Sequence, residues 1–384
     1  MRIFQDLEKT GHERLVFFYD RETGLKSIIG IHSTVLGPAL GGCRMWNYAS
    51  ESEALEDALR LSKAMTYKSA VAGLQLGGGK GVIIGDPNCA NKPELLKAFG
   101  KAVETLAGAY ITTEDVGIGV PDVDVIRSAT RYSVGGSYTG GGGDPSRMTA
   151  IGIFQGMKAA VKHAKLGESL PGLTVAIQGV GNVGYRLCGH LATAGARIIV
   201  CDIDPEKVKR VMREFVVKVV SPAEILEAEC DIFAPCALGA VLNSRTIPRL
   251  RCKIVAGAAN NQLESASDGL ALHERGILYV PDYVINAGGL INCAAELPGY
   301  DEEAARADAT KIYSTVDLIL SRSKAEDLLP LQVADSLAEE RIAEARAARQ
   351  GNVGRQVFKP EKSVASAQFV GPGVITSHVH NLGN

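Results

Sequence analysis

The stretch Thr174-Val175-Ala176-Ile177-Gln178, followed directly by Gly179-Val180-Gly181-Asn182-Val183-Gly184, decides the fold of the second half of the chain. A short apolar run that enters a glycine-rich turn predicts a buried strand, with a helix beginning near Val183. A second helix is predicted from Pro205. Further strands are predicted at Arg197–Asp202, Cys230–Cys236, Lys253–Ala259 and Ile277–Val280. Strands that alternate with helices predict a parallel sheet covered on both faces.

The glycine turn has the spacing of a dinucleotide site, GxGxxG between a strand and a helix. Gly179 would make the tight turn, Gly181 would let the backbone approach a pyrophosphate, and Gly184 would let helix and strand pack closely. The helix start offers free N–H groups to the phosphates. Asp202, which ends the next strand, would bind the ribose hydroxyls and repel a 2′-phosphate, which favours NAD over NADP. A glycine turn without a ligand is the alternative.

The first half of the chain predicts a mixed α/β domain. A hairpin is expected from Arg14–Asp20 and Leu25–Thr34, and the capping box of Ser50 and Glu53 starts a helix that runs to about Lys68. A strand at 81–85, a helix at 93–107 and a strand at 110–115 follow. The glycine-rich stretch 135–143 predicts a connection between domains and a hinge.

These elements divide the chain into two domains and a tail. Residues 1–138 are expected to form the substrate-binding, catalytic and oligomerisation domain, with 325–350 packing back on it. Residues 146–324 are expected to form a Rossmann-type dinucleotide-binding domain. The tail, 351–384, is either an arm for oligomer contacts or a segment without fixed structure.

Composition excludes several classes of function. The chain has 384 residues and a net charge of −2, so it has no global basic field for nucleic acid or an anionic membrane. No apolar run reaches the length of a signal peptide or a transmembrane helix. Its eight cysteines form no CxxC pair and no zinc signature, so we expect reduced thiols, a cytoplasmic location and no metal.

Two lysines and an aspartate are candidates for chemistry. Lys80 lies among glycines in Gly77-Gly78-Gly79-Lys80-Gly81, and Lys68 lies near the end of an apolar-faced helix. A desolvated lysine near a second cation has a lowered pKa and can act as a general base, while the charged lysine holds a carboxylate. Asp115 lies at a strand end, where ligands bind in open α/β sheets.

Each candidate also has a plainer interpretation. The GGGK stretch could be a phosphate-binding loop, although its spacing is not GxxxxGK[ST]. Lys80 could be a solvated lysine after a glycine turn, and Asp115 a turn former or helix cap. A cofactor-sensing protein without catalysis would have lost Lys68, Lys80 or Asp115, and all three are present.

Motifs in both halves resemble the Glu/Leu/Phe/Val dehydrogenase family, most closely its leucine dehydrogenases. The similarity runs in consistent order from about Phe4 to Arg346. In the first half it is carried by stretches 37–45, 65–68, 77–81 and 113–117. In the second half it is carried by stretches 178–184, 234–239, 258–263 and 281–289.

The resemblance implies a reversible oxidative deamination of an L-amino acid to a 2-oxo acid and ammonia, in a homo-oligomer that uses NAD. It implies that Lys80 is the general base and that Asp115 relays protons. Lys68 would bind the substrate carboxylate, together with Asn261 and the backbone of Gly41 and Gly42. The residues implied to contact the cofactor are Thr149, Gly179, Gly181, Asn182, Val183, Gly184, Asp202 and Asn286.

The resemblance also implies a pocket for the substrate side chain, lined by Leu40, Thr113, Val284, Leu290 and Cys293. All but Thr113 are apolar and none is a cation, which disfavours glutamate. A small apolar substrate (leucine, valine or isoleucine) is therefore expected. Thr113, Leu290 and Cys293 depart from the usual leucine dehydrogenase residues, so an aromatic substrate, phenylalanine or tryptophan, is the alternative.

Overall fold

The computed structural model describes residues 3–137 and 141–353. Among the described residues, those up to Arg346 belong to one compact unit, and 347–353 lie outside it. The predicted tail, 351–384, therefore lies almost entirely outside the described residues. No helix of the described part is long and apolar enough to cross a membrane.

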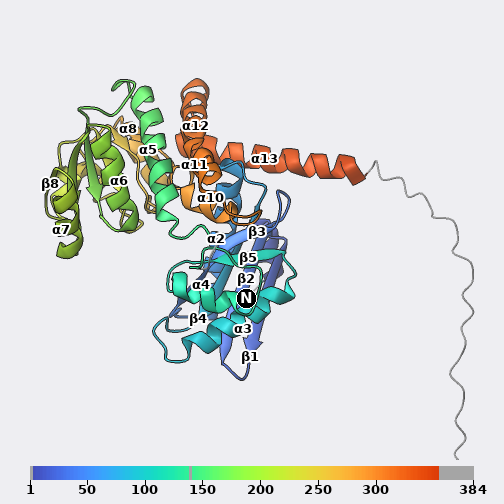
Figure 1. The fold of residues 1–384 in the computed structure, drawn as a ribbon. Coiled ribbons are helices and arrows are strands. Elements are labelled where there is room, and N and C mark those ends of the chain that lie inside the picture. The colour runs from blue at the N-terminus through green and yellow to red at the C-terminus, as the bar shows by residue number, and fades with distance from the viewer. Residues whose placement is uncertain (1–2, 138–140, 354–384) are drawn as a thin grey trace, which may run out of the picture. The chain divides into compact units, whose positions relative to one another are not determined.

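The first sheet has five strands in the order β1-β2-β4-β3-β5 (Figure 1). β1 and β2 form the predicted antiparallel hairpin, β2 also pairs antiparallel with β4, and β3 pairs parallel with both β4 and β5. The elements of this part are α1 (Ile3–Thr10), β1 (Arg14–Asp20), β2 (Leu25–Ser33), β3 (Ala39–Trp46), α2 (Glu51–Val71), β4 (Gly77–Ile84), α3 (Lys92–Thr105), β5 (Tyr110–Thr113) and α4 (Val120–Arg127).

Helices cover both faces of this sheet. On one face, Ala54 and Ala58 of α2 pack with Ile28 and Val82 of the strands. On the other face, side chains of α3 and α4, among them Phe99, pack against the opposite sides of the same strands. The predicted start of α2 is confirmed, because the Ser50 hydroxyl accepts a hydrogen bond from the Glu53 N–H at 3.2 Å.

The second sheet has six strands in the order β11-β10-β9-β6-β7-β8, all parallel. This is the strand order of the Rossmann fold, so the predicted parallel sheet is confirmed. Its elements are α5 (Ser146–His163), β6 (Thr174–Gln178), α6 (Asn182–Thr193), β7 (Arg197–Cys201), α7 (Pro205–Glu214), β8 (Val217–Val219), η1 (Ile225–Glu227), β9 (Ile232–Pro235), η2 (Ile247–Arg249), β10 (Ile254–Val255), α8 (Ala266–Glu274) and β11 (Leu278–Tyr279).

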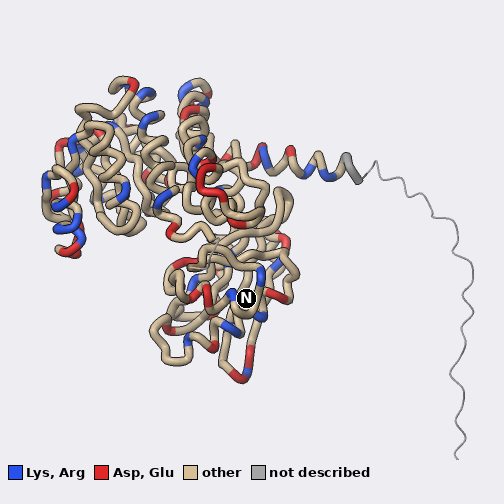
Figure 2. Tube along the Cα trace, in the orientation of Figure 1, with Lys and Arg blue, Asp and Glu red and all other residues tan. Residues whose placement is uncertain are grey.

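The sheet has a buried core on each face. In β6, Val175 and Ile177 face the core under α5 and α6, whereas Ala176 faces the core that includes η1 and η2. Burial on both faces explains why these strands are continuously apolar rather than alternating. Figure 2 shows acidic and basic residues intermixed along α7 and α13, as expected for solvated helix faces.

The remaining helices are α9 (Asp282–Ile285), α10 (Gly288–Ala294), α11 (Glu302–Thr310), α12 (Ile312–Glu326) and α13 (Pro330–Val353). α11 and α12 pack mainly on α5, whereas α13 contacts the end of α2. In that contact, the guanidinium of Arg341 donates to the carbonyls of Ala70 and Val71, both at 2.7 Å. α13 therefore contacts the first part of the chain, whereas α11 and α12 pack on α5 of the second part. The predicted domain boundaries stay predictions.

Two buried histidines join the first residues of the chain to α2. The His12 ring bonds the Ser62 hydroxyl at 2.8 Å, and the His32 ring bonds the Thr66 hydroxyl at 2.9 Å. Their ring centroids lie 4.8 Å apart. Burial lowers the pKa of each imidazole from 6.5 to about 4.

We expect this pair to make the fold sensitive to acid. Both rings take up protons near pH 6.5 in the unfolded chain but only near pH 4 in the folded chain, so stability falls as pH drops through that window. The midpoint of urea unfolding should therefore fall less between pH 7 and pH 5 in the double variant His12→Gln/His32→Gln than in the parent. His273→Gln, at an exposed position, is the control and should keep the parent's pH dependence. Identical slopes for all three proteins would contradict the assignment.

Candidate active site

Lys80 extends from the centre of a strand in which it is flanked by glycines, Gly77 to Gly79 before it and Gly81 after it. The absence of side chains in β4 lets its neighbours approach closely, since a Cβ on Gly78 would lie 2.0 Å from the Thr66 nitrogen of α2. A Cβ on Gly79 would lie 2.6 Å from the Tyr110 ring on the other face. Lys80 is therefore buried, with 4% of its surface exposed, and its Nζ donates to Oδ2 of Asp115 at 2.7 Å.

Asp115 accepts a second charged hydrogen bond at the same oxygen. The Nε of Arg44 lies 2.8 Å from Oδ2. Burial by itself would raise the pKa of Asp115, but the adjacent charges of Lys80 and Arg44 outweigh it and hold that pKa below its usual value. The carboxylate is thus ionised and can accept a proton from a bound group.

The structure decides against the plainer interpretations of these residues. β4 begins at Gly77, four residues before the predicted Gly81, because the glycines pair in the ladder with β2 and β3. The GGGK stretch is therefore a strand interior and not a phosphate-binding loop. Lys80 is not a solvated lysine, and the Asp115 side chain bonds two cations rather than capping a helix.

Lys68 lies at the last turn of α2 and is half-buried. Its Nζ donates to Oδ1 of Asn286 at 2.7 Å. Burial and the charge of Lys80 lower the pKa of Lys68 to about 8, against an opposing effect of Asp282. The lowered pKa thus belongs to the lysine that the resemblance assigns to carboxylate binding, because its hydrogen-bond partner is a neutral amide.

The Lys68 contact continues into the second sheet through Asn286, which is buried. The Asn286 Nδ2 donates to the carbonyl of Ala258 at 3.0 Å and to Oδ1 of Asn260 at 2.9 Å. Asn261 has an exposed side chain and a φ of 51°, and its carbonyl accepts from the Ala240 N–H at 2.7 Å. Among the described residues, Asn260 and not Asn261 joins this hydrogen-bonded chain.

Four of the five predicted pocket residues come together. Leu40, Leu290 and Cys293 belong to one buried apolar cluster that also includes Ile111. The Thr113 hydroxyl lies 3.7 Å from the Cys293 sulfur. Val284 is buried in the core beneath α5 and α6 instead, because it lies on the short helix α9.

Gly41 and Gly42 lie on β3 between the apolar cluster and Asp115. The pairing of β3 with β4 includes Leu40 and Cys43 but has no pair at either glycine. The Gly41 carbonyl accepts a hydrogen bond from the Tyr110 hydroxyl at 2.7 Å. The glycines are also tightly packed, since a Cβ on Gly42 would lie 2.3 Å from the Glu114 carbonyl oxygen.

The glycine turn after β6 has the conformation that its spacing predicts. Gly179 has a φ of 94°, and a Cβ on Gly184 would lie 2.1 Å from the Gly179 carbonyl oxygen. A Cβ on Gly181 would meet no described atom within 4 Å. α6 begins at Asn182, which is exposed, with Val183 in its first turn and no side-chain cap. Its first N–H groups are therefore open to an anion.

Asp202 bonds the backbone of this turn, whereas Thr149 lies beside Gly288 and Gly289. Asp202 follows β7, and its Oδ2 accepts from the Val180 N–H at 2.8 Å while its Oδ1 accepts from the Asp204 N–H at 2.9 Å. Asp204 caps α7 by accepting from the Glu206 N–H at 2.9 Å. The Thr149 hydroxyl, in the first turn of α5, donates to the Pro145 carbonyl at 2.9 Å.

The glycine-rich connection is fastened at two points. The Glu296 carboxylate accepts from the N–H of Gly135 at 2.9 Å and from the N–H of Gly142 at 2.7 Å. Residues 138–140, in the middle of the predicted hinge, lie outside the described residues. The hinge role stays a prediction.

Sequence reasoning missed two residues of this region, Arg44 and Asn260. Arg44 carried a signal, because an arginine inside an apolar strand such as β3 requires a buried partner. Asn260 carried none, because only the folded chain shows which of two adjacent asparagines meets Asn286. No group of three or more His, Cys, Asp or Glu side chains within 3–137 and 141–353 has the arrangement of a metal site.

Family-wide sequence profiles match both halves of the chain. Residues 12–132 match the Glu/Leu/Phe/Val dehydrogenase dimerisation domain. Residues 140–205 and 200–349 match the Glutamate/Leucine/Phenylalanine/Valine dehydrogenase domain.

Individual relatives agree with these profiles. The chain is 53% identical over 350 residues to leucine dehydrogenase of Thermoactinomyces intermedius, covering 91% of this chain and 96% of the relative. It is 47% identical over 346 residues to valine dehydrogenase of Streptomyces albus, covering 89% and 95%. The crystal structure of L-tryptophan dehydrogenase from Nostoc punctiforme superposes with a TM-score of 0.80 at 44% identity, covering 90% and 99%. The resemblance seen in the motifs is confirmed: the chain belongs to the Glu/Leu/Phe/Val dehydrogenase family and is an amino-acid dehydrogenase.

Proposed function

We propose that this protein catalyses the NAD-dependent, reversible oxidative deamination of a small apolar L-amino acid (leucine, valine or isoleucine). The products are the 2-oxo acid, ammonia and NADH. One observation carries the proposal: the Lys80–Asp115 ion pair and the half-buried amine of Lys68 accompany an apolar cluster that contains no cation. Leucine and valine dehydrogenases among the relatives support the same substrate class.

Each polar group has a distinct role in this proposal. Lys68 binds the substrate carboxylate, and the backbone of Gly41 and Gly42 and the side chain of Asn261 assist it. Lys80 takes a proton from the water that attacks Cα, and Asp115 exchanges protons with the departing amine. Both steps require groups held within hydrogen-bond reach of the substrate, as the 2.7 Å Lys80–Asp115 contact supports.

The apolar end of the substrate lies against Leu40, Thr113, Leu290 and Cys293. A side chain with a second carboxylate finds no cation there, so glutamate is a poor substrate. Val284, also expected in this pocket, belongs to a different core.

The second sheet fits a dinucleotide cofactor, which when bound accepts the hydride that leaves Cα. The open space at Gly181 and the uncapped start of α6 suit a pyrophosphate. Asn182 and Val183 lie in the first turn of α6, and we assign Thr149 to cofactor contact as well. Asp202 is fixed by two backbone N–H groups and keeps lone pairs for ribose hydroxyls, so we propose NAD rather than NADP. Asn286, bound to Lys68, would sit near the nicotinamide.

The protein also acts, in this proposal, as a homo-oligomer in the cytoplasm. The match of residues 12–132 to a dimerisation domain supports self-association. The eight cysteines, all within the described residues, are free thiols, which suits a reducing compartment.

An aromatic L-amino acid is the second candidate substrate. The specific support is the similarity to L-tryptophan dehydrogenase from Nostoc punctiforme, which is 47% identical to this chain over 344 residues. Valine dehydrogenase of Streptomyces albus has the same identity, 47%, over 346 residues. The two candidates differ only in the volume that the apolar cluster leaves, and one methylene changes discrimination by about 1–3 kcal/mol.

Turnover of a panel of L-amino acids tests both candidates and the role of Lys80. We expect NAD reduction with leucine, valine or isoleucine to exceed that with phenylalanine, tryptophan and glutamate. Lys80→Ala should lower kcat by at least about a thousandfold, because it removes the general base and leaves Asp115 without one of its two partners. Lys26→Ala, on the neighbouring strand β2 with an exposed side chain, is the control. Parent-like turnover by Lys80→Ala would remove Lys80 from the mechanism.

The pKa of Lys68 predicts how carboxylate binding depends on pH. Above its pKa of about 8 the amine loses its charge. The dissociation constant of 4-methylpentanoate should therefore rise by nearly tenfold per pH unit between pH 8.5 and 10, measured by calorimetry in the presence of NAD. The uncharged 4-methylpentanamide serves as the matched ligand and should bind with little pH dependence. Equal pH dependence for both ligands would contradict carboxylate binding by Lys68.

Asp202 predicts cofactor preference. Asp202→Asn should raise the KM for NAD and raise kcat/KM for NADP relative to NAD by about tenfold or more, because the charge that repels a 2′-phosphate is removed. Asp204→Asn, two residues on, changes a helix cap instead and should leave the NADP/NAD ratio as in the parent. Steady-state kinetics with both cofactors measures this ratio, and an unchanged ratio in Asp202→Asn would count against the assignment.

A further inference from the structure

Arg44 lies between two carboxylates that are far apart in the sequence. Its Nε donates to Oδ2 of Asp115 and its Nη1 donates to Oδ2 of Asp57, both at 2.8 Å. Its side chain is only 20% exposed. One guanidinium therefore connects the Lys80–Asp115 pair to helix α2.

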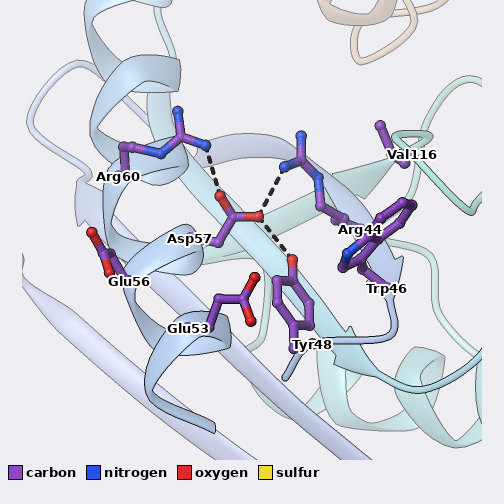
Figure 3. Close-up of a pocket in the computed structure, with 8 residues that line it drawn as sticks. All are labelled: Arg44, Trp46, Tyr48, Glu53, Glu56, Asp57, Arg60 and Val116. Atoms are coloured by element: carbon purple, nitrogen blue, oxygen red, sulfur yellow. Dashed lines mark hydrogen bonds and ion pairs between the residues drawn. The ribbon is translucent and has the colours of Figure 1, made fainter. Parts of the chain in front are cut away.

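The outer carboxylate, Asp57, is itself held in place. Figure 3 shows its two oxygens bonded to three side chains that converge on it. The Tyr48 hydroxyl lies 2.8 Å from Oδ2, and the Arg60 Nη2 lies 2.7 Å from Oδ1. These groups line a surface pocket of about 340 Å³. Asp57 therefore holds the guanidinium of Arg44 through Nη1, and this contact fixes the position of Nε next to Asp115.

The geometry at Asp115 gives Arg44 and Lys80 different tasks. Both donate to Oδ2, and no described residue donates a hydrogen bond to Oδ1. A lysine that works as a base must be uncharged before it takes up a proton, whereas a guanidinium keeps its charge at all working pH values. Asp115 therefore keeps one permanent cationic partner whatever the state of Lys80.

We propose that Arg44 is a positioning residue for the deamination reaction: braced by Asp57, it holds Oδ2 of Asp115 and leaves Oδ1 to exchange protons with the substrate amine. The proposal rests on the function proposed above. Arg44 does not touch the substrate and acts through Asp115. A lysine at this position would keep the charge but could not reach both carboxylates with the planar geometry of a guanidinium.

Removing Arg44 changes the electrostatics of Asp115 in a defined direction. With one cation lost, the burial that opposes ionisation weighs more, and the pKa of Asp115 rises. The other charged or titratable groups that act on Asp115 or feel its charge come from α2, β3, β4, β5 and the adjoining loop: Lys68, Cys43, Tyr48, Lys80, Tyr110 and Glu114. Apart from Lys80, none of them bonds Oδ2 of Asp115.

Arg44→Gln and Arg44→Lys test the proposal through the pH profile of the best amino-acid substrate of the parent. For Arg44→Gln we expect kcat to fall by about ten- to a hundredfold, with KM for the amino acid within about threefold of the parent. The acid limb of kcat should move to higher pH by about one unit. Arg44→Lys should keep the acid limb of the parent and recover part of kcat.

Arg251→Gln is the matched control, since Arg251 pairs with Glu229 at the surface and contacts neither Asp57 nor Asp115, and it should retain the kcat and pH profile of the parent. A parent-like kcat and acid limb in Arg44→Gln would overturn the proposal. So would an acid limb in Arg44→Lys that moves to higher pH by about one unit, a result that stands even where the glutamine variant does not fold. If the parent protein oxidised no amino acid, that result would instead refute the proposed function, on which the role of Arg44 rests.

Discussion

A buried carboxylate shared by two cations is the constraint on which the first domain depends. Asp115 is partly withdrawn from water, so its charge is tolerable only because Lys80 and Arg44 both contact Oδ2. These three residues come from a loop, β4 and β3, and the contact fixes the relative positions of all three. The same contact accompanies the burial of Lys80, which is 4% exposed. Ionic compensation and the geometry that we propose for catalysis are therefore one arrangement.

The glycines of β4 make that arrangement possible. A strand with ordinary side chains at Gly78 and Gly79 would push α2 and Tyr110 away from the sheet, since the nearest atoms lie within 2.6 Å of a Cβ at either position. Close approach of α2 brings Lys68 toward the same region as Lys80. The lowered pKa of Lys68 follows from this proximity and from burial. Packing and electrostatics thus have a common origin in the missing side chains.

The second domain meets the first through a few polar contacts of high specificity. Lys68 bonds Asn286, Thr113 lies against Cys293, and Glu296 bonds the backbone at both ends of the glycine-rich connection. Each contact pairs a residue near the end of a strand or helix in one half with α9, α10 or their flanks in the other. A cofactor bound at the turn after β6 would therefore be presented to a substrate held by the first domain, which is the proximity that hydride transfer needs.

The sequence by itself determined the hairpin, the start of α2 at Ser50, the parallel sheet and the glycine turn, because each follows from local spacing: alternation, a capping box, apolar runs and GxGxxG. It also pointed to Lys68, Lys80 and Asp115 as candidates. Only the tertiary structure decided that Lys80 lies inside a strand, that Arg44 shares Asp115, that Asn260 rather than Asn261 joins Asn286, and that Val284 belongs to another core. Those facts depend on contacts between residues far apart in the chain. Local periodicity carries no information about which distant partner a buried charge or amide will meet.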